Sequence, residues 1–171
     1  MKEHYATFAA YNSWANRLLY AAAARLPDAL YRQDRGAFCG SLHGTLNHLL
    51  VADRVWMHRF TRTGDAPTQL DAILHDRLDD LRAAREAEDD RIARWIDGLG
   101  EGDLAGMIRY RRVTAPDDVV QPLHRALAHF FNHQTLHRGQ AHGLLTALGG
   151  RDAAPELDLL YFERLRERGG A

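Results

Sequence analysis

The sequence predicts an all-α protein built from four long amphipathic helices. Three observations favour this fold class. Apolar residues recur at steps of three and four along most of the chain, and prolines or glycines stand where these patterns stop. The composition is that of a globular protein, with 46% hydrophobic and 26% charged residues among 171. A chain of this length can bury enough surface to fold without covalent cross-links, so we expect one domain spanning residues 1–171.

The first two helices are expected at residues 2–26 and 41–61. The apolar stripe of the first ends at Leu26, and Pro27 follows, because the residue before a proline is pushed out of the helical conformation. Residues 27–40 form a polar connection. Ser41 can cap the second helix, whose inward positions are expected to be Leu42, Leu46, Leu49, Trp56 and Phe60.

The third helix is expected at residues 69–98, with apolar positions at near-heptad spacing. Residues 106–121 alternate instead of following a helical period, which predicts a short strand-like insert. Pro122 then opens the fourth long helix, which ends near Leu148 before two glycines. A short C-terminal helix follows at residues 155–167. Four long helices and a short tail helix are typical of a helical bundle.

Charge and cysteine content exclude several classes of function. The 22 basic residues are interleaved with 23 acidic ones, giving a net charge of −1, so we expect no nucleic-acid partner. One cysteine allows no internal disulfide, which favours a reducing, cytoplasmic location. The N-terminus lacks the pattern of a signal peptide, and no apolar run approaches the roughly 18 residues of a membrane span. A small-molecule substrate is the expected partner.

Two histidines of the fourth helix are the strongest functional signal. His133 and His137 lie four residues apart, so both rings can reach one metal ion on the same helix face. The alternative is a solvated surface pair. His129 continues the stripe, either as a substitute ligand or as a group that orients a ligand ring; we favour the second role. His142 should point elsewhere.

A third ligand must come from another helix, and the second helix offers three histidines. His48 shares a face with Ala52 and Val55, whereas His43 and His58 point away from it. Burial of a neutral imidazole without a partner is costly, which favours coordination by His48. A hydrogen bond from His48 to a neighbour such as Asn12 is the alternative.

These segments resemble the DinB/YfiT-like superfamily over nearly the whole chain. The similarity is carried by YNSWAN (11–16), TLNHL with AD and W (45–56), HFFNHQTLHRGQ (129–140) and PELDLL (155–160). The resemblance implies an up-down-down-up four-helix bundle that binds one divalent metal ion. It also implies that His48, His133 and His137 are the ligands, and that His129 is a recurrent histidine that does not ligate.

One departure from the family pattern is Leu136, which stands where many members have a histidine. The position is not a ligand in the pattern, but a polar neighbour of the site is lost. Three imidazoles are compatible with Ni, Zn, Mn or Fe. Metal binding should weaken as the pH falls through about 6.5, because a protonated imidazole cannot ligate.

Three protein ligands leave an open coordination position, as in catalytic metal sites. Such an ion lowers the pKa of bound water or holds a thiol as thiolate. Some members of the superfamily are thiol-dependent transferases or isomerases. We therefore expect a metal-dependent enzyme that activates a low-molecular-weight thiol (an S-transferase or isomerase) or water (a hydrolase). The alternative is a non-catalytic ligand-binding or stress-response protein.

Other residues are weaker candidates. Glu88 falls on the apolar face of the third helix and could act as general acid or base, or as a fourth ligand of a structural metal; otherwise it stays in water. Arg138 could anchor an anionic substrate or pair with a carboxylate. Cys39 could supply a thiol, although a free cysteine is more often a packing residue. A homodimer is expected from an apparent excess of aromatic surface at Trp14, Tyr20, Tyr161 and Phe162.

Overall fold

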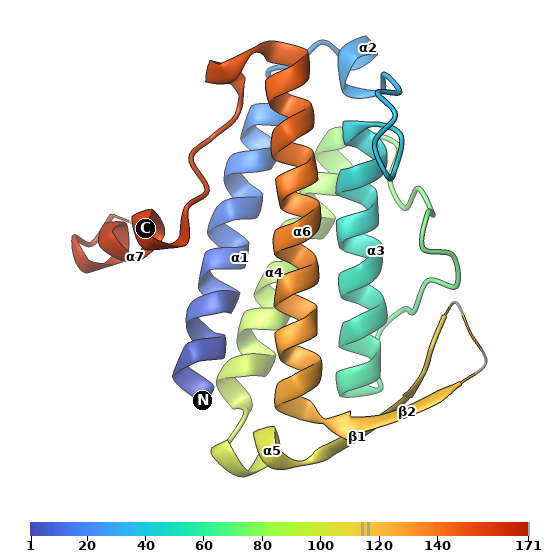
Figure 1. Ribbon diagram of the computed structural model, residues 1–171, viewed down its shortest axis with the longest axis vertical. Coiled ribbons are helices and arrows are strands. Elements are labelled where there is room, and N and C mark those ends of the chain that lie inside the picture. The colour runs from blue at the N-terminus through green and yellow to red at the C-terminus, as the bar shows by residue number, and fades with distance from the viewer. Residues whose placement is uncertain (114, 116, 171) are drawn as a thin grey trace.

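The computed structural model describes residues 1–113, 115 and 117–170. The protein is mainly helical and carries a small two-stranded sheet (Figure 1), so the predicted all-α class is confirmed. The long helices lie side by side: α1 (Lys2–Ala23), α3 (Leu42–Thr61), α4 (Leu78–Gly98) and α6 (Leu123–Gly149). Helix α1 packs against α4 and α6, and α3 packs against the same two helices.

The predicted bounds of α3 and α6 are right to within two residues. The Ser41 hydroxyl caps α3 by accepting a hydrogen bond from the Gly44 amide at 3.0 Å. Pro122 precedes α6 instead of lying in its first turn. The helix ends at Gly149, and Gly150 adopts a φ of 84°, a conformation that glycine reaches without strain.

The predicted start of the third helix is wrong, because α4 begins at Leu78 and residues 69–77 form a loop. Side chains of α3 bind the backbone of this loop. The Asn47 amide oxygen accepts hydrogen bonds from the backbone N–H groups of Leu74 at 2.9 Å and His75 at 3.1 Å. These tertiary hydrogen bonds replace the ones that a helical turn would have made.

Four smaller differences concern helix ends and short helices. The first helix stops at Ala23, three residues earlier than expected, and a turn, α2 (Asp28–Tyr31), follows. Helix α5 (Glu101–Ala105) was not expected either. The tail helix α7 (Leu159–Glu167) begins four residues after Pro155, where the Asp158 carboxylate accepts a hydrogen bond from the Tyr161 amide at 3.0 Å.

The strand-like insert is confirmed as an antiparallel hairpin. Strand β1 (Met107–Arg111) pairs with β2 (Asp118–Pro122) in a register that places Met107 opposite Pro122. Residues 114 and 116 of the predicted insert lie outside the described residues. The hairpin crosses the lower ends of α3 and α6 (Figure 1), and the Tyr110 and Trp56 ring centroids are 5.1 Å apart. The insert therefore closes one end of the space between these helices.

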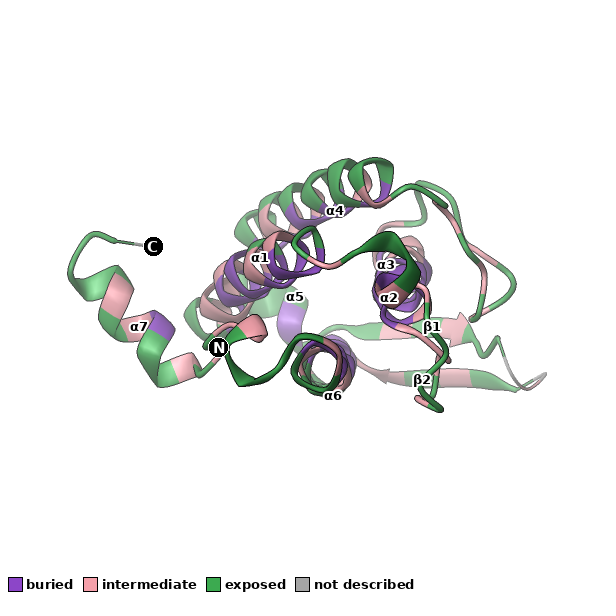
Figure 2. Ribbon diagram, turned by 90° about the horizontal axis from the view of Figure 1, so that it is seen from above, coloured by how far each residue is buried: buried purple, intermediate pink, exposed green. Residues whose placement is uncertain are grey.

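The buried faces of the long helices turn toward a common interior (Figure 2). Most of that interior is apolar, but a buried polar network crosses it. The Arg85 guanidinium lies 2.7 Å from Asp53 and 3.0 Å from Asp89, both of them buried. The network is completed by amide donors on α1 and α6, namely Asn12, Asn16 and Gln134. All four long helices thus contribute to one connected polar cluster.

The aromatic residues that suggested a dimer are mostly internal. Trp14, Tyr20 and Phe162 are buried within the chain, where Phe162 of α7 packs on Trp14 of α1 at 5.2 Å between ring centroids. Only Tyr161 of that group is exposed. The premise of surplus aromatic surface is therefore wrong for three of the four residues. Within the described part of the chain, no helix combines the length and the apolar character that crossing a membrane requires.

Candidate metal centre

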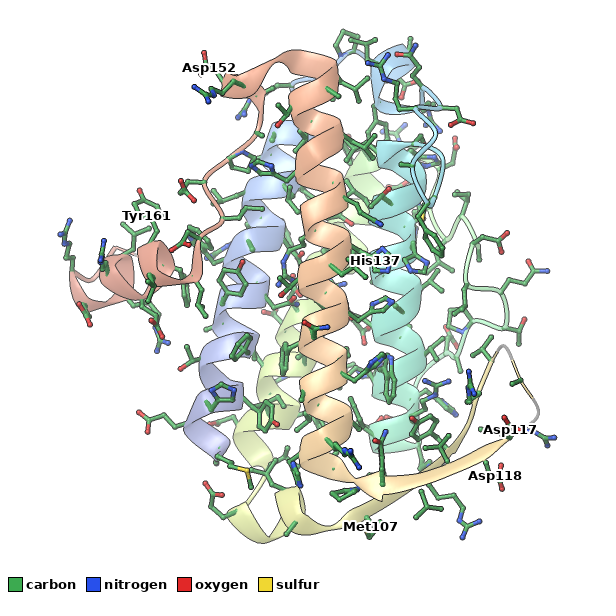
Figure 3. All side chains as sticks on the ribbon, in the orientation of Figure 1. Met107, Asp117, Asp118, His137, Asp152 and Tyr161 are labelled. Carbon is green, nitrogen blue, oxygen red and sulfur yellow. The ribbon has the colours of Figure 1, made fainter. Side chains whose placement is uncertain are left out.

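Three histidine rings meet between α3 and α6, midway along the helices. The His48 ring centroid lies 4.4 Å from that of His137 and 5.5 Å from that of His133. The His133 and His137 centroids are 4.3 Å apart. Figure 3 shows His137 between the two helices, in the space that α3 faces. The structure thus brings together the three residues that the resemblance implies as ligands.

Hydrogen bonds fix the orientation of two of these rings. His48 Nδ1 lies 2.7 Å from the Leu70 carbonyl oxygen, and His137 Nδ1 lies 2.8 Å from Gln140 Oε1. Because these oxygens can only accept, each Nδ1 carries the proton and each Nε2 keeps its lone pair. A metal-bound histidine is commonly oriented in this way, by a carbonyl or amide oxygen on its other nitrogen.

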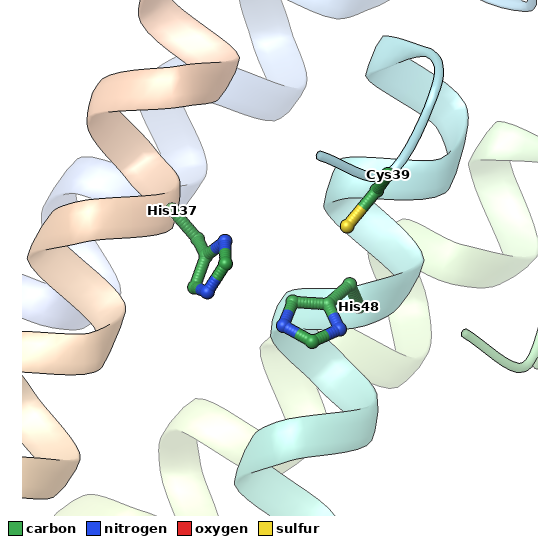
Figure 4. Close-up of side chains that lie close together, drawn as sticks. All are labelled: Cys39, His48 and His137. Atoms are coloured by element: carbon green, nitrogen blue, oxygen red, sulfur yellow. The ribbon is translucent and has the colours of Figure 1, made fainter. Parts of the chain in front are cut away.

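Two ring nitrogens of this cluster are buried without a hydrogen-bond partner among the described residues: His48 Nε2 and His133 Nδ1. An unpaired polar atom in a buried place is costly unless a ligand satisfies it. His48 is only 4% exposed, and its Nε2 faces the ring of His137 (Figure 4). The donor set therefore fits a divalent ion that accepts imidazole nitrogen.

Cys39 adds a sulfur atom to this cluster. Its Sγ and one ring nitrogen from each of His48 and His137 all lie within 4.8 Å of one another (Figure 4). Cys39 belongs to the connection before α3, and its neighbour Phe38 packs against the same two rings. Among the described residues, Cys39, His48 and His137 form the group whose ligand atoms lie this close together, and His133 is the alternative third donor by the position of its ring.

Two histidines of the cluster, His133 and His137, are held in their neutral form. Burial, followed by the nearby His137, His48 and His129, lowers the pKa of His133 to about 3. Burial and His48 also lower the pKa of His137. Neutral imidazole is the form that binds metal. At these two positions, competition by protons should therefore begin below the pH of about 6.5 that an ordinary imidazole sets.

The metal-free protein should lose stability as the pH falls from about 6.5 toward about 3. The folded state lowers the pKa of His133 below its ordinary value of 6.5, so the unfolded chain binds the proton more readily. The stabilising effect is complete above the unfolded pKa and decreases as the pH falls toward the folded pKa. Thermal unfolding of chelator-treated protein, followed by circular dichroism at several pH values, measures it.

Replacing His133 with glutamine should flatten this pH dependence, whereas His142→Gln, on the same helix outside the cluster, should leave it unchanged. An unchanged slope in His133→Gln would show that His133 does not titrate with folding.

His129 lies on the far side of His133 from His137. Its ring centroid is 5.9 Å from that of His133 and 5.2 Å from that of Trp56. Among the described residues no hydrogen bond joins it to a predicted ligand, and the orienting groups are Leu70 and Gln140 instead. Leu136, the residue that departs from the family pattern, is 58% exposed, so its side chain lies in solvent.

Neither Glu88 nor Arg138 lines the cavity beside the histidines. Glu88 is buried, against the alternative that placed it in water, and it pairs with Arg91 at 2.9 Å. Arg138 is buried on the side of α6 that faces α1, with its guanidinium carbon 5.0 Å from the Tyr11 ring centroid and a hydrogen bond to Asn12. Asn12 binds Arg138 and His48 binds the Leu70 carbonyl, so Asn12 is not the partner of His48.

Sequence reasoning missed three parts of the site. Cys39 was considered only as a nucleophile or packing residue, and its sulfur lies at ligand distance because the loop before α3 folds over the histidines. Gln140 was part of the quoted HRGQ motif, and its position three residues after His137 was the available signal. The loop residue Leu70 carried no signal in the sequence.

Comparison with known proteins agrees with the resemblance seen in the motifs. The sequence model of the DinB family matches residues 1–169. The chain is also similar to Protein DinB of Bacillus subtilis (strain 168), at 25% identity over 169 residues, which covers 92% of this chain and 94% of that protein.

Proposed function

The chain belongs to the DinB family, and from this premise we propose that it is a metal-dependent enzyme whose divalent ion is held by His48, His133 and His137. The observation that supports the ligand set most directly is the buried, unpaired Nε2 of His48, beside a second imidazole oriented in the same way. The three side chains come from two packed helices, α3 and α6, so the fold itself holds them together.

The architecture we propose is the up-down-down-up four-helix bundle. It is supported by the packing of α1 and α3 against both α4 and α6, and by the course of the chain in Figure 1. This arrangement places the two ligand-bearing helices, α3 and α6, as direct neighbours. The location we propose is the cytoplasm, where a single cysteine stays reduced.

The proposed chemistry is activation of a nucleophile. A divalent ion bound by neutral imidazoles would lower the pKa of a coordinated thiol or water. The chain's own part is to orient the ligand rings through Leu70 and Gln140 and to enclose the reactants in the adjoining cavity. We propose a low-molecular-weight thiol as co-substrate, in an S-transferase or isomerase reaction, with hydrolysis as the variant that uses water.

The experiment that tests this function has two steps. Metal analysis of protein purified without an affinity tag should give about one equivalent of Ni, Zn, Mn or Fe. A screen of low-molecular-weight thiols against electrophiles should then give turnover that a chelator abolishes. Tight ligand binding without turnover would identify a non-catalytic binder instead, and protein that takes up no divalent metal would refute the proposal.

Serine at Cys39 should leave the metal content near one equivalent, because three imidazoles remain. The cobalt-loaded protein should show no sulfur-to-metal charge-transfer band in the near ultraviolet, with or without this substitution. Loss of metal in Cys39→Ser, or a charge-transfer band that disappears with it, would show that Cys39 is a ligand. The coordination position that the proposed reaction needs would then be closed by the protein.

A further inference from the structure

A cavity of about 520 Å³ adjoins the histidine cluster. His48 and His133 form part of its wall, and the remaining wall comes from α3, α6, the loop before α4 and the hairpin. Its volume is within the range of sites that bind small molecules. Two arginines, Arg59 and Arg112, are among the described residues that line it, and none of those residues is an aspartate or glutamate.

Arg59 is held in a fixed position at this cavity. Its guanidinium carbon lies 4.5 Å from the Trp56 ring centroid and 4.6 Å from the Tyr110 ring centroid, so the cation contacts two aromatic rings that also contact each other. One terminal nitrogen donates to the Arg111 carbonyl at 3.1 Å. A guanidinium fixed in this way is ordered before any ligand arrives, which reduces the entropic cost of binding.

The charge of Arg59 is not neutralised within the described part of the chain, where no carboxylate lies within ion-pair distance of it. Burial lowers the pKa of Arg59, which reflects the cost of holding this cation away from water. Its positive field also reaches the cavity wall, because burial and then Arg59 lower the pKa of His129. An anion in the cavity would offset both costs.

We propose that Arg59 binds the anionic group of the substrate, a carboxylate or phosphate carried on a small apolar body. The planar fork of a guanidinium matches the oxygens of either group, and Val55 and Val119 supply apolar wall for the body of the ligand. Arg59 lies about three helical turns beyond His48 on α3, so a bound anion would leave the rest of the molecule directed toward the histidines. In that respect the inference rests on the proposed function.

The test measures binding of small aromatic anions to metal-loaded and to chelator-treated protein. Benzoate, 3-phenylpropionate and phenyl phosphate are the probes, and benzamide is the uncharged counterpart of benzoate. Isothermal titration should show that at least one anion binds both protein forms and that benzamide does not bind. Tighter binding of a carboxylate than of phenyl phosphate would identify the anionic group as a carboxylate, and the reverse order would identify it as a phosphate.

In Arg59→Gln the Kd of the bound anion should rise at least tenfold, and Arg59→Lys should recover part of the affinity because the charge is kept. Arg54→Gln, on the same helix but away from the cavity, is the matched control and should bind like the parent protein. Denaturant unfolding of each variant separates this effect from loss of structure, since Arg59 also links α3 to the hairpin.

The possible results distinguish the anion site from the metal site. Anion binding that requires the metal and is unaffected by Arg59→Gln would place the anion on the ion and overturn the inference, with the metal site intact. Binding that depends on Arg59 in a protein that takes up no metal would support the anion site and refute the proposed function. Absence of binding by all three anions at millimolar concentration would overturn the inference.

Discussion

Alanine at His48, His133 or His137 should reduce bound metal from about one equivalent to well below one. Each replacement leaves two imidazoles, and two neutral ligands do not hold a divalent ion against dilution and washing during purification. The expected loss is the same at the three positions, because each ring supplies one of three bonds. Elemental analysis of untagged protein, purified at a fixed pH above 7, measures it.

Substitutions at Gln140 and His129 test whether a residue must hydrogen-bond a ligand ring, or only lie near it, to affect metal binding. The Gln140 side chain accepts the hydrogen bond of His137 Nδ1, so Gln140→Ala should weaken metal affinity by about 10- to 100-fold. His129 has no such bond to a ligand among the described residues, and His129→Ala should retain metal, which revises the supporting role expected from sequence. His58→Ala and His142→Ala serve as controls with unchanged metal content.

Full metal retention in His133→Ala would contradict the three-histidine set. Combined with metal loss in Cys39→Ser, that result would replace His133 by Cys39, whose sulfur lies within 4.8 Å of the ligand atoms of His48 and His137. Metal loss in His129→Ala together with full retention in His137→Ala would mean that the ligands lie one turn earlier on α6.

Much of the candidate site could be predicted because it depends on helical geometry. His133 and His137 share a helix face wherever α6 packs in the fold, because an α-helix has 3.6 residues per turn. The burial of His48 followed from its apolar neighbours on the same helix. The burial of Arg138 was not predicted: successive helical residues point about 100° apart, so a residue adjacent to His137 turns away from its site, but this angle does not say whether it then faces the interior or solvent.

The parts that could not be predicted depend on irregular segments. The loop at residues 69–77 carries a helix-like apolar pattern, but Asn47 and His48 bind its backbone. Cys39 reaches the histidines through a loop whose path has no sequence period. Glu88 was correctly placed on the apolar face of its helix, yet its partner Arg91, three residues later, removes the free carboxylate that an acid–base role would need.

Replacing Arg85 with methionine should destabilise the protein by about 3–5 kcal/mol, the usual cost of removing one partner from a buried ion pair. Arg85 is 1% exposed and lies between the buried carboxylates of Asp53 and Asp89, at 2.7 and 3.0 Å. Burial lowers the pKa of Arg85, but Asp89 and Asp53 outweigh it and the net shift is upward, so the cation persists. Methionine would leave the buried Asp53 and Asp89 carboxylates held only by amide donors, and burial already raises the pKa of Asp53 to about 7 with Arg85 in place.

Denaturant unfolding followed by circular dichroism measures this loss, and Arg82→Met is the matched control. Arg82 lies one turn earlier on α4 in an exposed pair with Glu86, so its replacement should change stability by less than about 1 kcal/mol. If Arg85→Met does not fold, adding Asp53→Asn and Asp89→Asn should recover folded protein, because the uncompensated charges are then removed. Equal stability of Arg85→Met and the parent protein would show that the carboxylates are already protonated in the folded state. The cluster that joins the four long helices would then stabilise the fold by packing and not by charge pairing.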